Sequence, residues 1–418
     1  MIYNEGKYNY HWETKKLAEL GEFSRGVSKH RPRNDERLFE GGGYPLVQTG
    51  DVKDADLYIT KHTQEYGEFG LKQSKLWKEN TLCITIAANI AETALLSYPM
   101  CFPDSVVGFN ADPDMTTEEF MYYIFEYIRT SIQNSASGSI QDNINIDYLT
   151  SLEFKIPKKN YQDKIVSLLS DIDKKIINNR KINDNLEKQL AATFDYYLSQ
   201  ANDNGAMVWS SSMQKKFPST WEIADIKEVC DIIDCLHSKK PDYCYESDDY
   251  YLLGLDNISK EGYIVSNPRY YITEGDYKVW TSKIELMEND FVITNAGRAG
   301  DIGKVPQGVK CAIGRNITAV RPRQINPYYL RQFFKSKYFK IQVTKNLDSG
   351  SFFSSFNVKS IRELEIPIPD DSTMSRLCTI FTPIITEIER NVEEIEKLSS
   401  YREWLLPMLM NGQATISD

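Results

Sequence analysis

The sequence lacks the features that mark membrane and secreted proteins. It contains no run of roughly eighteen apolar residues, the length that a transmembrane helix needs. The opening segment MIYNEGKYNYHWETKK is polar and has no apolar core of the kind that a signal peptide carries. The seven cysteines are an odd number without a CxxC pair, so we expect reduced, mostly buried thiols instead of a disulfide framework. Together these absences predict a cytoplasmic protein.

Recognisable metal sites are also scarce. None of the four histidines stands in an HExxH motif or in another common metal or triad spacing. One group of residues could in principle surround zinc: Cys230, Cys235, His237 and Cys244. Their spacing fits no common zinc module, so we predict no metal site.

Motifs of nucleotide-using enzymes are incomplete. GRAGDIGK (297–304) resembles a phosphate loop, but five residues instead of four separate its outer glycines, and Val305 replaces the magnesium-binding Ser or Thr. NPRY (267–270) and NPYY (326–329) lack the second proline of the NPPY loop of amino-methyltransferases. The scattered carboxylates and lysines that some nucleases use have no recognisable spacing. A stand-alone enzyme of that type therefore stays an alternative.

The strongest positive signal is an internal repeat. Trp12 corresponds to Trp221, and ENTLCITIA (79–87) to ENDFVITNA (288–296), both at an offset of 209 residues. Further along, SGS at 137–139 matches SGS at 349–351 at an offset of 212. A unit of this length is too long for a solenoid repeat, so the sequence predicts a duplicated domain.

Both halves have the same order of predicted elements, which indicates an α+β fold made of two tandem mixed α/β domains. Runs such as YPLVQTG, TLCITIA, YYLLGL and DFVITNA predict strands. A helical stretch follows (TEEFMYYIFEYIRTSIQ; NPYYLRQFFKSKYFKIQ), then a polar glycine loop, a proline-containing strand and a long helix. The predicted parts are globular domains 1–157 and 217–369, long helices 158–200 and 370–412, an irregular linker 201–216 and a tail 413–418.

The two long helices share an apolar seam with heptad spacing. Asn179 and Asn391 occupy equivalent seam positions, where a polar pair would fix one register. Because segment 158–200 is net basic and 370–412 net acidic, we predict that the helices pair with each other. With pseudo-two-fold symmetry between the halves, the pair is an antiparallel coiled coil in which Asn179 lies close to Asn391. The alternative is two amphipathic helices, each packed on its own domain. The predicted seam includes Ile172, Ile176, Asn179, Leu186, Ile384, Ile388, Asn391 and Leu398.

These features, in this order and repeated, resemble a known family. A region opening with W…L…LG, a polar SGS…N loop, an IP exit and a long helix is similar to the specificity subunit of type I DNA restriction-modification complexes. YPLVQTGDV, DFVITNAGRAGDIGKV and the ending REWLLPMLMNGQATI resemble further segments of that family. The resemblance covers essentially the whole chain. The first half has ITIAANIAET in place of the glycine-rich loop, so a role for Arg298 does not carry over to it.

The resemblance implies a function without catalysis. Each globular half would be a target recognition domain that reads one half of a bipartite site in double-stranded DNA. The helices would set the spacer and dock methyltransferase subunits, two in number, through outward apolar residues such as Ile177, Ile182, Ile385 and Val392. This chain would bind no cofactor, whereas the methyltransferase subunits would hold S-adenosylmethionine and the restriction subunits ATP and Mg. The alternative within restriction systems is a specificity chain that pairs with a fused nuclease-methyltransferase.

Candidate DNA contacts follow from local charge and polarity. The net charge of −10 excludes a chain that is basic throughout but not local basic faces, and FSRGVSKHRPRNDER (23–37) concentrates cations that could neutralise phosphates or form a solvated loop. The SGS loops offer groups able to meet base edges, and the QTGD and LDN turns carry amides that could instead cap those turns. The candidates are Arg25, Lys29, His30, Arg31, Arg33, Gln48, Thr49, Ser139, Gln141, Asn257, Arg298, Arg315, Lys337, Lys345, Ser351 and Phe353.

Overall fold

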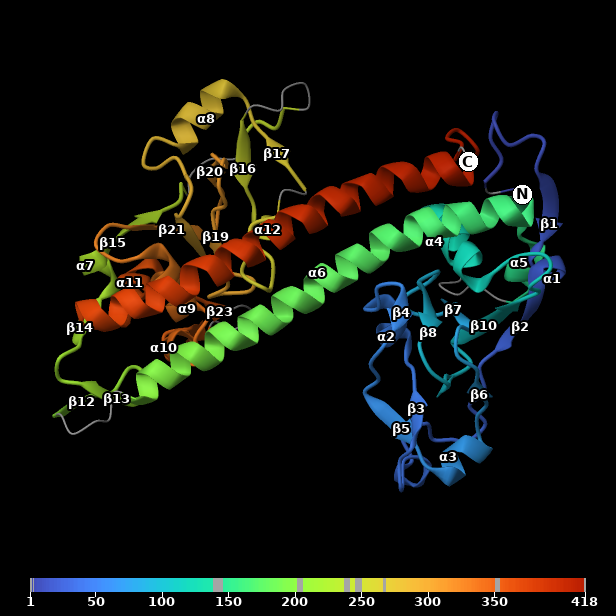
Figure 1. Cartoon of the computed structure of the whole chain (residues 1–418), viewed down its shortest axis with the longest axis horizontal. Coiled ribbons are helices and arrows are strands. Elements are labelled where there is room, and N and C mark those ends of the chain that lie inside the picture. The colour runs from blue at the N-terminus through green and yellow to red at the C-terminus, as the bar shows by residue number, and fades with distance from the viewer. Residues whose placement is uncertain are drawn as a thin grey trace. The chain divides into compact units, whose positions relative to one another are not determined.

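The structure is a computed structural model that describes residues 2, 4–137, 146–200, 206–236, 241–244, 250–265, 268–349 and 354–416. Two compact units make up the chain (Figure 1): unit 1 comprises Met1–Asn178 and Lys397–Asp418, and unit 2 comprises Asn179–Glu396. The division falls within two long helices, α6 (Lys159–Gln200) and α12 (Asp371–Met410), so each unit contains part of both. Within the described part of the chain, every helix is too short or too polar to span a bilayer.

The described part of unit 1 is built on two larger sheets and one two-stranded sheet. The larger sheet has the order β2 (Gly21–Arg25), β10 (Val106–Ala111), β7 (Leu82–Thr85), β8 (Thr93–Leu96) and β4 (Tyr58–Ile59). The smaller sheet has the order β5 (Gln64–Tyr66), β3 (Tyr44–Leu46), β9 (Met100–Cys101) and β6 (Leu76–Trp77), and β1 (Glu13–Lys16) pairs with β11 (Glu153–Ile156). Its shorter helices are α1 (Leu17–Leu20), η1 (Glu36–Leu38), α2 (Thr49–Lys53), α3 (Glu68–Lys72), α4 (Glu118–Ser137) and α5 (Ile146–Ser151).

The core of unit 1 lies between the larger sheet and its helices. The apolar face of α4 packs in one buried cluster with β7 and β10 of the sheet and with residues from both long helices. Each such side chain, when fully buried, contributes roughly 1.5–3 kcal/mol to folding. The part of α6 in this cluster supplies Ile165 and Leu169, and the part of α12 supplies Leu406, Leu409 and Met410. Both long helices are therefore structural members of unit 1.

Unit 2 repeats this plan. Its main sheet has the order β15 (Cys230–Asp234), β21 (Ile317–Pro322), β18 (Phe291–Thr294) and β19 (Ile302–Lys304), and a second has β17 (Tyr270–Tyr271), β16 (Tyr251–Leu253) and β20 (Ala312–Ile313). Three two-stranded pairs are β12 (Met207–Ser210) with β13 (Lys215–Pro218), β14 (Glu222–Asp225) with β24 (Glu365–Ile368), and β22 (Asp348–Ser349) with β23 (Ser354–Ser355). Its shorter helices are α7 (Ile226–Val229), η2 (Leu255–Asn257), α8 (Glu274–Trp280), α9 (Pro327–Phe334), α10 (Lys337–Lys345) and α11 (Val358–Arg362). The predicted tandem domains of mixed helix and strand are confirmed.

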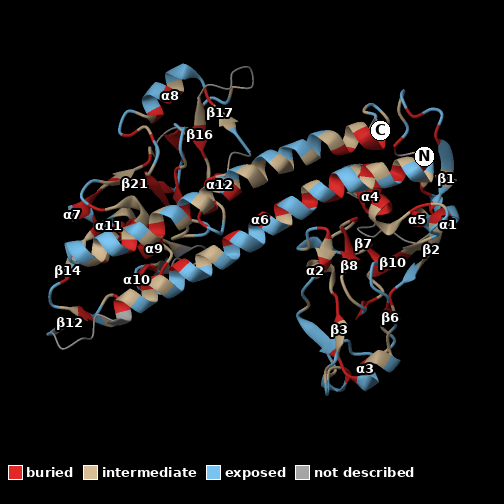
Figure 2. Cartoon of the chain, in the orientation of Figure 1, coloured by how far each residue is buried: buried red, intermediate tan, exposed pale blue. Residues whose placement is uncertain are grey.

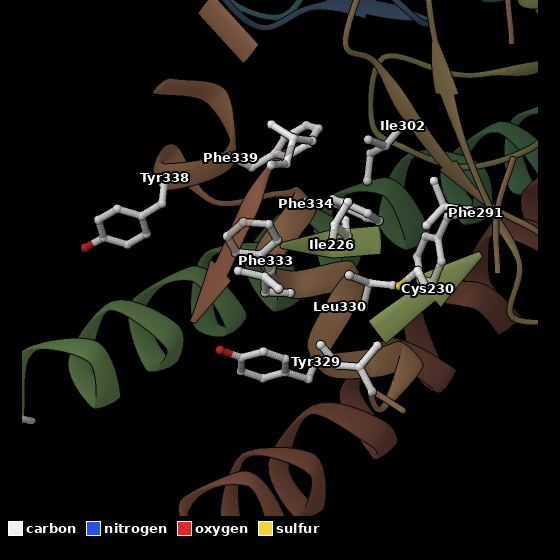
Figure 3. Packing of buried hydrophobic residues seen from close by; sticks show 14 of the residues in the cluster. Ile226, Cys230, Phe291, Ile302, Tyr329, Leu330, Phe333, Phe334, Tyr338 and Phe339 are labelled. Carbon is white, nitrogen blue, oxygen red and sulfur yellow. The ribbon is translucent and has the colours of Figure 1, made fainter. Parts of the chain in front are cut away.

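The core of unit 2 is rich in aromatic side chains. Figure 3 shows Tyr329, Leu330, Phe333 and Phe334 of α9 packed near Phe291 of β18. The predicted helix over 326–342 is in fact two helices, because the Ser336 side chain accepts a hydrogen bond from the Phe339 amide and begins α10 anew. The predicted linker 201–216 is also partly structured, since β12 pairs with β13 and the Met213 side chain between them is fully buried in this core.

The long helices run antiparallel in each unit. In unit 2, Asn183 of α6 accepts from Asn391 of α12 at 2.8 Å, and Asn179, one turn earlier, donates to Glu394 at 2.7 Å. In unit 1, Asp173 forms an ion pair with Arg402 at 2.6 Å. Rising residue numbers on α6 therefore meet falling numbers on α12 within unit 2, as predicted for an antiparallel pair.

Buried and exposed residues alternate along both long helices (Figure 2), but the buried ones depart from the predicted heptad seam. Phe194 and Leu198 are 2% exposed, whereas the heptad spacing selects Thr193 and Tyr197, which are only partly buried. An α-helix with 3.6 residues per turn drifts away from a 3.5-residue spacing, so the stripe has moved by one position at this end. Of the predicted seam, Ile176, Asn179, Ile388 and Asn391 are buried, and Ile172, Leu186, Ile384 and Leu398 are half-buried.

The predicted Asn179–Asn391 pair is shifted by one helical turn. At the repeat offset of 212, the observed pair Asn183–Asn391 corresponds to Ile395 and Asn179. Isoleucine cannot accept a hydrogen bond from an amide, so Asn179 donates to Glu394, which lies next to Ile395. Sequence equivalence located the buried amides but not the partner of each.

An ionic cluster with little exposure to solvent connects the globular domain of unit 2 to α6. Glu187 Oε1 lies 2.5 Å from Arg331 Nη2 and 2.7 Å from Lys335 Nζ, and it accepts from Tyr263 Oη at 2.5 Å. Arg331 is only 1% exposed. Burial alone would raise the pKa of Glu187, but the two cations outweigh it and lower that pKa to about 2. We call these four residues the Glu187 cluster.

The Asn183–Asn391 amide pair should contribute measurably to the stability of the protein. We expect Asn391→Ala to destabilise the protein by about 1–3 kcal/mol, because it leaves the Asn183 carbonyl oxygen buried without its donor. The double change Asn183→Leu with Asn391→Leu should be close to neutral. Urea unfolding is the measurement, with the exposed Asn178→Ala on α6 as the control. Equal stabilities of Asn391→Ala and the control would contradict the assignment.

The Glu187 cluster should give unit 2 an acid-sensitive stability. Because the pKa is lowered from 4.5 in the unfolded chain to about 2, its contribution is complete above pH 4.5 and disappears as the pH falls towards 2. By pH 3 the loss should be about 2 kcal/mol. We expect Glu187→Gln to be less stable at neutral pH and to show a correspondingly flatter profile between pH 6 and 3, in contrast to the exposed control Glu274→Gln. Parallel profiles of Glu187→Gln and wild type would be the contrary result.

Candidate nucleic-acid interface

One end of the larger sheet of unit 1 gathers several of the predicted sites. Strand pairing aligns Thr85 with Val106 and Ile84 with Thr93, and Arg25 pairs with Val107. The last residues of β2 and β7 therefore lie beside the first residues of β10 and β8. The hairpin loop 86–92 and the basic segment after Arg25 both start at this end of the sheet, which we call the loop edge of unit 1.

Unit 2 has the same loop edge. There, Thr294 pairs with Ile317, Ile293 with Ile302, and Asp234 with Thr318. The hairpin loop 295–301 and the exposed Arg315, just before β21, therefore lie at one end of the main sheet. Both units therefore have a loop edge at the same end of the main sheet, as expected for duplicated domains.

The structure describes only the residues that flank the two glycine loops with SGS. Ser139, Gln141, Ser351 and Phe353 lie outside the described residues. On the flank in unit 1, Gln133 of α4 donates to the Ile90 carbonyl of loop 86–92 at 2.9 Å. In unit 2, Asn295 donates through its side chain to the Phe356 carbonyl at 2.8 Å, and the Phe356 amide donates to the Asn295 carbonyl. The described flanks thus contact the loop edges.

The basic segment of unit 1 divides into free and paired cations. Arg25 and Lys29 are exposed and have no ion-pair partner among the described residues. Arg33 lies 2.5 Å and Arg31 3.6 Å from Asp104 carboxylate oxygens. Only the first two therefore present an uncompensated charge at the loop edge.

His30 and its neighbours form a separate small cluster. His30 Nε2 lies 2.7 Å from Asp35, and Arg37 Nη2 lies 2.6 Å from the same carboxylate. The hydrogen bonds from Arg37 and His30 hold the pKa of Asp35 well below its usual range. The His30 ring also contacts Phe69 edge to face, with 5.3 Å between centroids. His30 is thus held within the segment and is a weaker candidate for a direct contact.

Several predicted contacts prove to be structural. Asn257 is 1% exposed, and its amide donates to the Val265 and Pro268 carbonyls while its oxygen accepts from the Gly254 amide. This residue is corrected from a DNA contact to a turn cap. Gln48 is the N-cap residue of α2 and donates to Gln64 at 3.2 Å, and both Gln48 and the adjacent Thr49 are half-buried.

Three predicted cations of unit 2 also have intramolecular partners. Arg298 donates to the Ile258 carbonyl and forms an ion pair with Asp301 at 3.3 Å. Lys337 pairs with Asp195 of α6 at 2.9 Å, and Lys345 donates to the Ser211 carbonyl at 2.7 Å. Arg315 has no ion-pair partner among the described residues. It is therefore an exposed cation at the unit 2 loop edge, and it stays a candidate contact.

The cysteine group is divided between separate parts of unit 2. Cys230 lies in the aromatic core, whereas Cys235 lies in a second apolar cluster with Leu253 and Val305. Burial raises the pKa of the Cys230 thiol to about 12, so it is protonated at neutral pH. His237 lies outside the described residues. Among the described residues no three His, Cys, Asp or Glu side chains are grouped as metal ligands.

One residue of the loop edge was missed by the sequence reasoning. Asn89 occupies the position in loop 86–92 that Arg298 occupies in loop 295–301. Its side chain is half-buried and has no hydrogen-bond partner among the described residues. Extending the offset of 209 by two residues past the aligned ENTLCITIA segment would have identified it.

Comparisons with known proteins agree with this duplicated arrangement. A family model described as type I restriction modification DNA specificity domain matches residues 9–188 and 218–398. The type I restriction enzyme MjaIX specificity subunit of Methanocaldococcus jannaschii is 21% identical over 425 residues, covering 99% of this chain and 96% of that protein. The MjaVIII specificity subunit of the same organism is 19% identical, covering 97% and 94%. A crystal structure of a type I restriction-modification S subunit from M. genitalium shares the fold with a TM-score of 0.60 at 17% identity, covering 100% of both chains. The chain therefore belongs to the family of type I restriction-modification DNA specificity domains and carries two such domains in tandem.

Proposed function

We propose that this chain is the non-catalytic specificity subunit of a type I restriction-modification complex, in which each unit reads one half of a bipartite site in double-stranded DNA. The observation that supports this most directly is the duplicated loop edge. Each family domain presents a hairpin loop, the flank of a polar glycine loop and at least one exposed, unpaired cation at one end of its main sheet. Cations contact phosphates irrespective of sequence, and loops carry the groups that meet base edges.

The long helices are proposed to set the spacer between the half-sites and to dock two methyltransferase subunits, with restriction subunits joining the complex. Their antiparallel packing within each unit supports this role. Ile385 no longer fits the docking role, because it is fully buried in the core of unit 2, and Ile177 and Val392 pack against the cores. Ile182, 38% exposed on α6, remains a docking candidate.

The cofactors of the reaction are assigned to the partners in this proposal. S-adenosylmethionine would be bound by the methyltransferase subunits, and ATP and Mg by the restriction subunits. The specificity chain would contribute the choice of sequence. We place the protein in the cytoplasm, where its DNA substrate and these cofactors are found.

Exchange of one domain tests the function as a whole. We expect that replacing residues 217–369 by another domain of this family, chosen to keep basic residues at the positions of Arg331 and Lys335, changes one half of the methylated motif and leaves the other half and the spacer unchanged. Sequencing of methylated bases in cells that carry the complex is the measurement. The purified chain alone, given methyl donor and DNA, should leave the DNA unmodified. A change in both half-sites, an altered spacer or methylation by the isolated chain would each reject part of the proposal.

The free cations should contribute affinity without sequence preference. We expect Arg25→Ala with Lys29→Ala to weaken binding to any DNA and to reduce the slope of log K against log salt by about 2, because each cation releases roughly one counterion. The matched control is Lys174→Ala on α6, an exposed cation paired with Asp171. Filter binding of the assembled complex at several salt concentrations measures the slope. An unchanged slope in the double variant would exclude these two residues from the interface.

A further inference from the structure

The hairpin loops of the two loop edges have the same backbone despite different sequences. Ala88 and Ala91 have φ angles of 61° each, and at the repeat offset of 209 they correspond to Gly297 and Gly300, with φ of 75° and 90°. Glycine adopts this left-handed region freely, whereas a side chain makes it unfavourable. The glycine-rich appearance of the second loop thus hid an equivalence that the backbone reveals.

The same hydrogen bonds hold both loops. The hydroxyl of Thr85 donates to the Asn89 carbonyl and accepts from the Glu92 amide, and the Ala91 amide donates to the Thr85 carbonyl. In unit 2, the hydroxyl of Thr294 donates to the Arg298 carbonyl and accepts from the Asp301 amide, and the Gly300 amide donates to the Thr294 carbonyl. A buried threonine at the end of the strand therefore fixes the shape of each loop.

Unit 1 keeps this shape although it carries alanine at both left-handed positions. Ala91 is 1% exposed, and Gln133 of α4 holds the neighbouring Ile90 carbonyl. Unfavourable backbone conformations persist where the surrounding structure imposes them, and they occur preferentially at binding sites. The loop therefore presents its tip residue, at position 89, in a defined place at the loop edge.

The two tip residues, Asn89 and Arg298, differ in whether their side chains have intramolecular partners. The Arg298 side chain is occupied by the Ile258 and Leu255 carbonyls and by Asp301. The Asn89 side chain has no partner among the described residues, so its donor and acceptor are available. A carboxamide pairs with adenine through two hydrogen bonds, to N6 and N7 in the major groove.

We propose that Asn89 is a specificity-determining residue of unit 1 and that it selects adenine at one position of the half-site that this unit reads. The inference rests on the proposed function and adds to it a residue and a base. Arg298, at the equivalent place, acts as a brace of its own loop. The two loops thus share one backbone shape, but the side chain at the tip has a different role in each.

The test changes the tip and maps the motif of the whole complex. Asn89→Ala should relax one position of one half-site and weaken binding to the cognate site about 5- to 150-fold, with binding to unrelated DNA unchanged. Asn89→Asp should shift the preference at that position from adenine towards cytosine, because a carboxylate only accepts. The matched control is Asn80→Asp, which makes the same change at an exposed residue before the opposite end of β7. It should leave the motif intact.

A second arm separates the tip from its scaffold. Ala88→Gly with Ala91→Gly removes the unfavourable conformations and keeps Asn89, so the motif should stay that of the wild type. An unchanged motif in both Asn89 variants would overturn the inference, as would an equal loss of binding to all DNA. If instead the wild-type complex recognised no motif, the proposed function itself would fail, which is a different result from a wild-type motif that ignores Asn89.

Discussion

The antiparallel packing of α6 against α12 is the constraint on which the rest of the fold depends. Each globular domain needs apolar side chains from both helices to complete its core: Ile165 and Leu409 in unit 1, Phe194 and Phe381 in unit 2. Because α6 follows the first repeat and α12 the second, neither repeat contains all of the side chains that bury its own domain. The duplication is visible in the sequence, but the folded units cut across it.

The buried core of each unit supports its loop edge. The strands β7 and β18, which lead into the hairpin loops, are buried along their length, and a threonine with a buried hydroxyl closes each loop. A base contact must be held to within fractions of an ångström to discriminate, since a misplaced amide pairs as poorly with the correct base as with the wrong one. In the proposed function, this support holds loop residues such as Asn89 in a defined place.

Local patterns predicted much of this structure. The repeat, the long helices, strands such as 82–85 and 291–294 and the buried amides all follow from composition and spacing within a segment. What the sequence could not supply depends on distant partners: Asp104 beside Arg33, Glu187 beside Arg331, and the carbonyls that surround Asn257. The sequence does not show whether an arginine faces solvent or a buried carboxylate. For that reason the fold was predicted better than the individual contact residues.

The two units use different chemistry at equivalent places of their helix contacts. Asp173 and Arg402, which form the ion pair in unit 1, correspond at the offset of 212 to Ile385 and Leu190, both fully buried in unit 2. An ion pair and an apolar pair of similar volume stabilise a core comparably, but a mixture of the two leaves a buried charge alone. The first domain contacts this ion pair directly, because Tyr123 of α4 donates to Asp173 at 2.7 Å and Glu126 lies 3.7 Å from Arg402, so it is matched to its own stretches of helix. The first domain could not take the place of the second without bringing those stretches of helix with it. The order of the two domains along the chain is therefore fixed by the contacts that each domain makes with the long helices.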